Sequence, residues 1–122
     1  MADALIIDDN RTTADALKQM LAVLGLQARV SYGSSPAMTI LGRGFVPRFI
    51  LLDINMPGVD GIELLAYLRR EPQLIPVPVF VVTSDDQPET RRKVMKQGAT
   101  AMIIKPATID GLESALKKAK IL

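Results

Sequence analysis

Acidic side chains follow two short apolar runs of the sequence. Asp8 and Asp9 come directly after Ala4–Ile7, and Asp53 comes directly after Phe49–Leu52. Three carboxylates gathered at one place repel one another and need a counter-charge. The chain contains no His and no Cys, so a metal bound by these residues would have oxygen ligands. Such a ligand set favours Mg²⁺.

A hydroxyl and an amine follow two further apolar runs. Thr83 follows Val77–Val82, and Lys105 follows Ala101–Ile104. A carboxylate that attacks a phosphoryl donor forms an acyl phosphate. The phosphoryl oxygens then need positive charge and hydrogen-bond donors, which Lys105, Thr83 and a divalent cation can supply. The residues therefore supply the parts that phosphoryl transfer to a carboxylate requires.

Each of these residues also has an ordinary structural interpretation. Asp8, Asp9 and Asn10 are typical of a turn that caps a helix, and Asp53 can cap a loop. Residues 55–58 and 60–61 have the composition of turns, residues 83–85 can cap the helix that follows, and a lysine before proline can lie on the surface. The shared position at the ends of successive strands favours the chemical interpretation.

The elements that would position these residues alternate along the chain. Five runs have the length and composition of strands: Ala4–Ile7, Gln27–Ser31, Phe49–Leu52, Val77–Val82 and Ala101–Ile104. Gln27–Ser31 alternates polar and apolar residues, as expected of an edge strand. Strand–helix alternation predicts an α/β fold, a doubly wound (βα)5 unit with a five-stranded parallel sheet. Ligands of such sheets bind at the carboxyl ends of the strands.

Helical patterns fill the intervals between these runs. The expected helices are a stripe from Ala14 to Leu24 ended by Gly25, a helix capped by Ser35 with Pro36 in its first turn, a stripe from Ile62 to Leu68, a polar helix from Pro88 to about Gln97, and a stripe from Leu112 to Ala119 capped by Thr108. Caps, first-turn prolines and terminal glycines delimit them.

Composition and charge limit the class of protein. A chain of 122 residues, 48% of them hydrophobic, predicts one domain over residues 1–122. The net charge of +2, from 15 basic and 13 acidic residues, is too small to indicate a nucleic-acid surface. Neither a membrane span nor a secretory signal is apparent, and the absence of Cys fits the cytoplasm.

Four motifs in order resemble the receiver domain of two-component response regulators. They are Asp8-Asp9, residues 51–61 (LLDINMPGVDG), Val82-Thr83-Ser84 and Ile104-Lys105-Pro106. Each motif is weak alone, but the four together are specific. The resemblance covers the whole chain and implies a flavodoxin-like fold with strand order 2-1-3-4-5, which the compact chemotaxis regulators share.

The resemblance also implies roles for individual residues. Asp53 would accept the phosphoryl group, and Asp9 and Asp53 would bind Mg²⁺ directly, with the backbone carbonyl of Asn55. Asp8 would act largely through water. Thr83 would donate to a phosphoryl oxygen. Lys105 would pair with the phosphoryl group and precede a cis peptide bond.

The family's partners follow from the same resemblance. A sensor histidine kinase or a histidine phosphotransfer protein would donate the phosphoryl group. A downstream protein would bind the face formed by the fourth helix, fifth strand and fifth helix, and neither a membrane nor a nucleic acid is an expected partner. The domain would be a phosphoacceptor switch with self-catalysed phosphotransfer and autodephosphorylation, not a classical enzyme.

Three positions depart from the family pattern. Met102 stands where many receivers have Tyr or Phe, Ala107 stands where Phe is frequent, and Ser84 stands where a smaller residue is common. Methionine is flexible and can repack. These differences predict that the acceptor chemistry is retained, while the switch is read out in a different way.

Two other functions are compatible with an aspartate at a strand end. A phosphatase of the haloacid dehalogenase type needs a second aspartate two positions after the nucleophile, where this chain has Asn55. A flavin-binding electron carrier needs a phosphate cradle after the first strand, where Asp8 and Asp9 would repel the phosphate. Both alternatives are therefore less favoured than the phosphorylation switch.

Overall fold

The computed structural model describes residues 2–58 and 60–122, so Val59 of the second motif lies outside the described residues. Helices and strands alternate in the order β1 (Ala4–Ile7), α1 (Arg11–Val23), β2 (Ala28–Ser31), α2 (Ser34–Gly42), β3 (Phe49–Leu52), α3 (Gly61–Leu68), β4 (Val79–Thr83), α4 (Pro88–Lys96), β5 (Ala101–Ile104) and α5 (Ile109–Lys118). The strands form one parallel sheet in the order β2-β1-β3-β4-β5. The predicted α/β fold and its strand order are confirmed.

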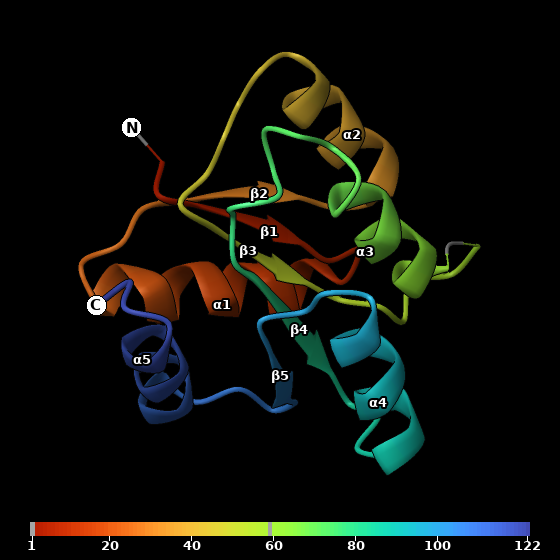
Figure 1. Ribbon diagram of the computed structural model, residues 1–122. Helices are drawn as coiled ribbons and strands as arrows, with labels where there is room; N and C mark the ends of the chain where they lie inside the picture. The colour runs from red at the N-terminus through yellow and green to blue at the C-terminus, as the bar shows by residue number, and fades with distance from the viewer. Residues whose placement is uncertain (1, 59) are drawn as a thin grey trace.

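Helices cover both faces of this sheet (Figure 1). Successive residues of each strand point to opposite faces, so β1 contributes Leu5 and Ile7 to one apolar cluster and Ala4 and Ile6 to the other. The first cluster is completed by α2, α3 and α4, and the second by α1 and α5. Both faces of the central strands are therefore buried, which explains their continuous apolar sequences.

Several predicted boundaries are wrong. The second strand begins at Ala28, one residue after the predicted Gln27. The fourth strand extends from Val79 to Thr83, two residues later than predicted at its start, because Pro78 has no N–H to donate to the ladder. Helix α2 begins at Ser34 after the N-cap Gly33, so Ser35 is not the cap. Pro36 lies within the first turn, where a missing N–H costs nothing, and the helix extends two residues before it.

Helices α1 and α5 begin at the caps predicted for them. Asn10 accepts from the Thr13 N–H, and Thr108 accepts from the Gly111 N–H. Asp60 caps α3 by accepting from the Ile62 and Glu63 N–H groups. The cap residue Asn10 directly follows Asp8 and Asp9, so these two aspartates form the short connection between β1 and α1.

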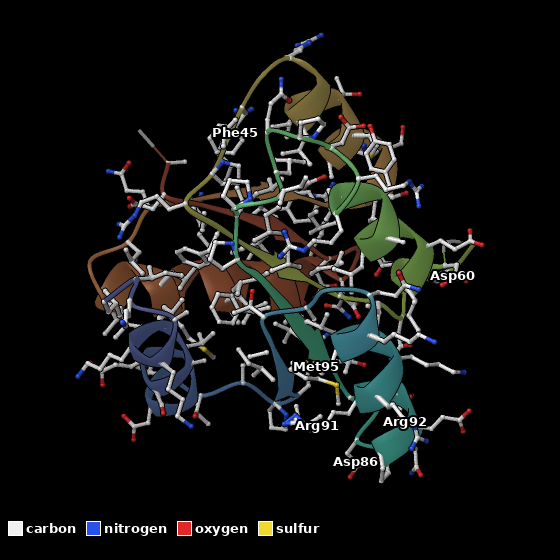
Figure 2. All side chains as sticks on the ribbon, viewed as in Figure 1. Phe45, Asp60, Asp86, Arg91, Arg92 and Met95 are labelled. Carbon is white, nitrogen blue, oxygen red and sulfur yellow. The ribbon has the colours of Figure 1, made fainter. Side chains whose placement is uncertain are left out.

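The outer surfaces of the helices are polar. Arg91, Arg92 and the partly exposed Met95 project from α4 (Figure 2). In the described part of the chain, no helix has the length and apolar composition needed to cross a membrane.

Candidate functional site

The carboxyl ends of β1 and β3 bring two aspartates side by side. Ile7 and Leu52 are register partners in the sheet. Hydrogen bonding between β1 and β3 continues one residue beyond Leu52: the Asp53 N–H donates to the Ile7 carbonyl at 2.9 Å. On the other side of β1, the Asp8 N–H donates to the Ser31 carbonyl at 3.1 Å. Backbone hydrogen bonds therefore fix the main-chain positions of Asp8 and Asp53, from which the two carboxylates project.

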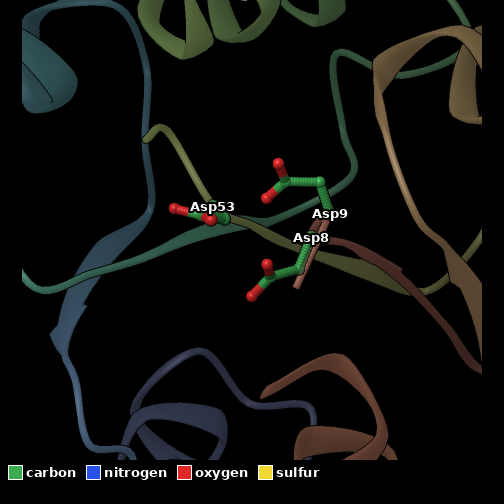
Figure 3. A group of neighbouring side chains, drawn as sticks. All are labelled: Asp8, Asp9 and Asp53. Carbon is green, nitrogen blue, oxygen red and sulfur yellow. The ribbon is translucent and has the colours of Figure 1, made fainter. Parts of the chain in front are cut away.

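Three carboxylates form one cluster at this edge (Figure 3). Oxygens of Asp8, Asp9 and Asp53 all lie within 4.8 Å of one another. Asp8 is 1% exposed and Asp53 is 5% exposed, whereas Asp9 is open to solvent. Two buried acids and one exposed acid, all offering oxygen, match the ligands that a hard divalent cation prefers.

Lys105 supplies the positive charge that the cluster has in this structure. Its Nζ lies 3.2 Å from Asp8 Oδ2 and 3.5 Å from Asp53 Oδ2. The lysine backbone is fixed to the sheet, since its N–H donates to the Thr83 carbonyl at 2.8 Å. The peptide bond from Lys105 to Pro106 is cis, as predicted. One ammonium against three carboxylates leaves a net negative charge, which a cation can offset.

Thr83 is fully buried at the end of β4 and lies beside the cluster. Its Oγ1 accepts from Asn55 Nδ2 at 2.8 Å and from the Asp85 N–H at 3.1 Å. The Asn55 N–H in turn donates to Asp53 Oδ1 at 2.9 Å. Asn55 therefore links the aspartate at the end of β3 to the threonine at the end of β4.

Burial and like charge act together on Asp8. Burial among apolar residues raises the pKa of the Asp8 carboxyl, and the neighbouring Asp53 raises it further. The Asn10 N–H, which donates to Asp8 Oδ1 at 2.9 Å, and the Lys105 ammonium partly oppose this rise. The folded protein thus disfavours the ionised form of Asp8, and additional positive charge beside the carboxylate would stabilise it.

A shallow hollow of about 410 Å³ opens above the carboxylates. Its lining consists of Asp9, Asn10, Asp53, Asn55, Pro57, Ser84 and Lys105. Asp8 and Thr83 are buried and are not among these lining residues. A small anion entering the hollow from solvent would meet Asp53 and Lys105 together.

All six residues singled out from the sequence lie at this one edge of the sheet: Asp8, Asp9, Asp53, Asn55, Thr83 and Lys105. The ordinary interpretations are also partly right, since Asp8 and Asp53 accept local backbone N–H groups while they belong to the carboxylate cluster. The structural and chemical interpretations therefore apply to the same side chains.

Sequence reasoning missed the role of Gly61, which it treated as an ordinary turn residue. A Cβ at this position would lie 2.6 Å from the Ile54 carbonyl oxygen and would also overlap the Ile54 Cα. Only a residue without a side chain lets the start of α3 pack against the loop that follows Asp53. A glycine directly after a capping aspartate was the available signal.

Comparison with known proteins places this geometry in a family. The sequence matches the response regulator receiver domain family over residues 4–117. It is 31% identical over 115 residues to the chemotaxis protein CheY-3 of Vibrio cholerae, covering 93% of this chain and 88% of that protein.

Solved structures share the fold across the whole chain. The signal receiver domain of a DNA binding response regulator from Colwellia psychrerythraea superposes with a TM-score of 0.89 at 24% identity, covering 100% of both chains. A response regulator from Burkholderia pseudomallei, solved with a phosphorylated aspartic acid, a calcium ion and citrate, has a TM-score of 0.84 at 24% identity, with coverage of 99% and 72%. Given the sequence match, the strand order and the acidic cluster at the strand ends, this chain belongs to the response regulator receiver domain family of two-component signal transduction.

Proposed function

We propose that this protein is a phosphorylation switch in which Asp53 accepts a phosphoryl group. The observation that supports it best is the position of Asp53 in the hollow, with oxygens of Asp8 and Asp9 within 4.8 Å and Lys105 Nζ at 3.5 Å. An Asp53 carboxylate oxygen would form a bond to phosphorus while the bond from phosphorus to the donor atom breaks. The leaving group keeps that electron pair.

Mg²⁺ fits the donor set of this site. Asp9 and Asp53 would hold it by their side chains, Asn55 by its backbone carbonyl, and Asp8 largely through water. When bound, the ion would supply positive charge for the phosphoryl oxygens and for the three carboxylates. Burial and the neighbouring Asp53 raise the pKa of Asp8, and this supports the assignment, because Lys105 alone does not offset these two effects.

Two side chains would stabilise the phosphoryl group directly. The Lys105 ammonium would pair with a phosphoryl oxygen, for which it needs to move little from its position against Asp53. The Thr83 hydroxyl would donate to a second phosphoryl oxygen. Its oxygen accepts two hydrogen bonds in this structure, and the hydroxyl would turn to bring its proton to the phosphoryl oxygen.

The partners are those of the family. A sensor histidine kinase or a histidine phosphotransfer protein would donate the phosphoryl group in the cytoplasm, and residues 1–122 would act as one domain. A downstream protein would bind the face formed by α4, β5 and α5. Exposed apolar side chains support this choice of face, since Met95 is 43% exposed and Ile104 is 40% exposed. No membrane or nucleic acid would take part directly.

Incubation with acetyl phosphate and Mg²⁺, followed by intact mass measurement, tests the proposal. Wild type should gain one phosphoryl group that alkali removes, and D53N should gain none. D86N is the matched control, because Asp86 is an exposed aspartate on the loop after β4, and it should be phosphorylated like wild type. Chelation of Mg²⁺ should abolish the adduct in every variant.

Two results would contradict the assignment. An adduct that persists in D53N would place the acceptor elsewhere in the chain. Steady turnover of a small phosphate ester, without an accumulating adduct, would favour the phosphatase alternative over the switch.

A further inference from the structure

Helix α4 is attached to the rest of the molecule by little apolar packing. Val94 is the one residue of this helix that is buried, and most of the other residues of the helix are polar or basic. By contrast, α3 buries four residues, Gly61, Leu64, Leu65 and Leu68. Since burial of apolar surface is the main force that fixes a helix to a sheet, α4 can shift at a lower cost than α3.

Asp85 holds the beginning of α4. Its Oδ1 accepts from the Gln87 N–H at 3.0 Å, and its Oδ2 accepts from the Thr90 hydroxyl at 2.6 Å. The Thr90 bond, and then the Gln87 bond, lower the pKa of Asp85, so the acceptor is a charged carboxylate. Gln87, the N-cap residue, makes no capping hydrogen bond with its side chain in the described structure. Asp85 therefore connects the N-cap residue Gln87 to Thr90 in the first turn of α4.

Asp85 is tied in turn to the threonine of the site. Its N–H donates to Thr83 Oγ1, which also accepts from Asn55 Nδ2. Within residues 2–58 and 60–122, the structure has no hydrogen bond donated by the Thr83 hydroxyl. If that hydroxyl turns to donate to a phosphoryl oxygen, its lone pairs turn away from Asp85, and the Asp85 N–H loses its acceptor.

We propose that phosphorylation of Asp53 is transmitted to α4 through a hydrogen-bonded chain of Thr83, Asp85 and Thr90. Turning of Thr83 would release the Asp85 backbone, the carboxylate would move with it, and α4 would lose the bond to Thr90 that anchors its first turn. Asp85 and Thr90 are positioning residues that act through Thr83. This inference rests on the proposed function, because it needs a phosphoryl group on Asp53.

The side chain at position 102 is a weaker candidate for this task. Met102 packs against the apolar cluster that contains Val94 and has no polar group that could follow Thr83. A flexible thioether side chain can adapt to several positions of its neighbours. The polar chain has a defined geometry at each step, and that makes it the better link between the site and α4.

The test compares T90V with T90S and T39V. T90V removes the donor to Asp85 and keeps the branched shape, whereas T90S keeps a hydroxyl. T39V is the matched control, because Thr39 donates to the Ser35 carbonyl within α2, away from the site. Amide hydrogen exchange of α4 is measured in each protein with and without acetyl phosphate and Mg²⁺, and intact mass gives the phosphorylated fraction.

In wild type, phosphorylation should speed exchange in the first turns of α4 by about fivefold, the factor for one net hydrogen bond of about 1 kcal/mol. T90V should show the faster exchange before phosphorylation and little further change after it. T90S and T39V should behave like wild type. M102A should keep the response of α4 to phosphorylation.

The outcomes separate the two proposals. If wild type forms no adduct, the proposed function fails and the inference fails with it. If the adduct forms and α4 does not respond, or if T90V responds as wild type does, the inference alone is overturned. Loss of the response in M102A, with the response retained in T90V, would assign the transmission to position 102 instead.

Discussion

Asp8 shows how a residue of the candidate site can oppose the stability of its own fold. The carboxyl is 1% exposed, and burial followed by the nearby Asp53 raises its pKa. A folded-state pKa above the unfolded value means that the ionised carboxyl destabilises the folded protein at neutral pH. This cost is released as the pH falls through the folded-state pKa.

D8N should therefore stabilise the metal-free protein. Asparagine keeps an oxygen that can accept from the Asn10 N–H and removes one of three clustered negative charges. We expect a gain of about 1 kcal/mol at neutral pH, which raises the melting temperature by about 4 °C for a domain of this size. Thermal unfolding with chelator present measures it. D86N should leave the melting temperature unchanged, and a lower melting temperature in D8N would contradict the electrostatic argument.

Gly61 is a second residue whose identity is set by its surroundings. G61A should destabilise the protein by about 1–3 kcal/mol, because the new methyl group would force α3 away from the Ile54 backbone. Denaturant unfolding measures the change. G42A is the control, since the space beside Gly42 is open and alanine is the better helix residue. Equal effects of the two substitutions would show that the contact with Ile54 is unimportant.

At the scale of elements, Arg69 connects the end of α3 to two other segments. Its Nε donates to the Gly98 carbonyl at 2.9 Å, and its Nη1 donates to the Leu74 and Ile75 carbonyls at 2.9 and 3.2 Å. Gly98 lies between α4 and β5 and has a φ of +100°. The guanidinium thus holds together the loops that follow α3 and α4.

R69A should destabilise the protein by about 1–3 kcal/mol, because three loop carbonyls lose a charged donor. R69K should recover only part of this, since an ammonium cannot reproduce the planar fork of donors. R70A, at an exposed position of the same helix end, should cost far less. Denaturant unfolding of the three variants decides the point, and equal losses in R69A and R70A would refute it.

An element could be predicted from the sequence where residues close to it in the chain determine it, and could not where contacts between distant segments determine it. The strands and the caps Asn10 and Thr108 follow from neighbouring residues, so sequence patterns were sufficient. The start of β4 was misplaced because apolar Val77 fits a strand pattern while Pro78 breaks the ladder. The contacts of Arg69 and the bond from Thr90 to Asp85 depend on how separate segments pack, and periodicity carries no information about them.

The site was predictable for a reason that belongs to the whole fold. In a parallel sheet the carboxyl ends of all strands lie at one edge, so residues after Ile7, Leu52 and Ile104 had to converge. Their distances and burial were not predictable, because these depend on the ladder extending to Asp53 and on the fit of Gly61. Topology determined which residues meet, and packing determined how closely.

At the scale of the whole molecule, metal binding and folding should be coupled through pH. A ligand that binds the folded state raises its stability by RT ln(1 + [L]/Kd), so Mg²⁺ should raise the melting temperature of wild type at neutral pH. Asp8 has a raised folded-state pKa, so protons compete with the ion as the pH falls through that value. The rise in melting temperature caused by Mg²⁺ should therefore become smaller at lower pH. The metal-free protein should become more stable over the same range, because protonation of Asp8 removes the cost of its buried charge.

Asp3 and Asp85 act in the opposite sense. The Gln27 N–H lowers the pKa of Asp3, and Thr90 lowers that of Asp85, so their contributions are present above the ordinary pKa and are lost at more acidic pH. Melting curves of wild type and D8N, with and without Mg²⁺ across this range, separate the two effects. D8N should show a smaller increment from Mg²⁺ with a weaker pH dependence. An increment in wild type that stays constant down to the pH at which Asp3 and Asp85 titrate would mean that Asp8 is not linked to the ion.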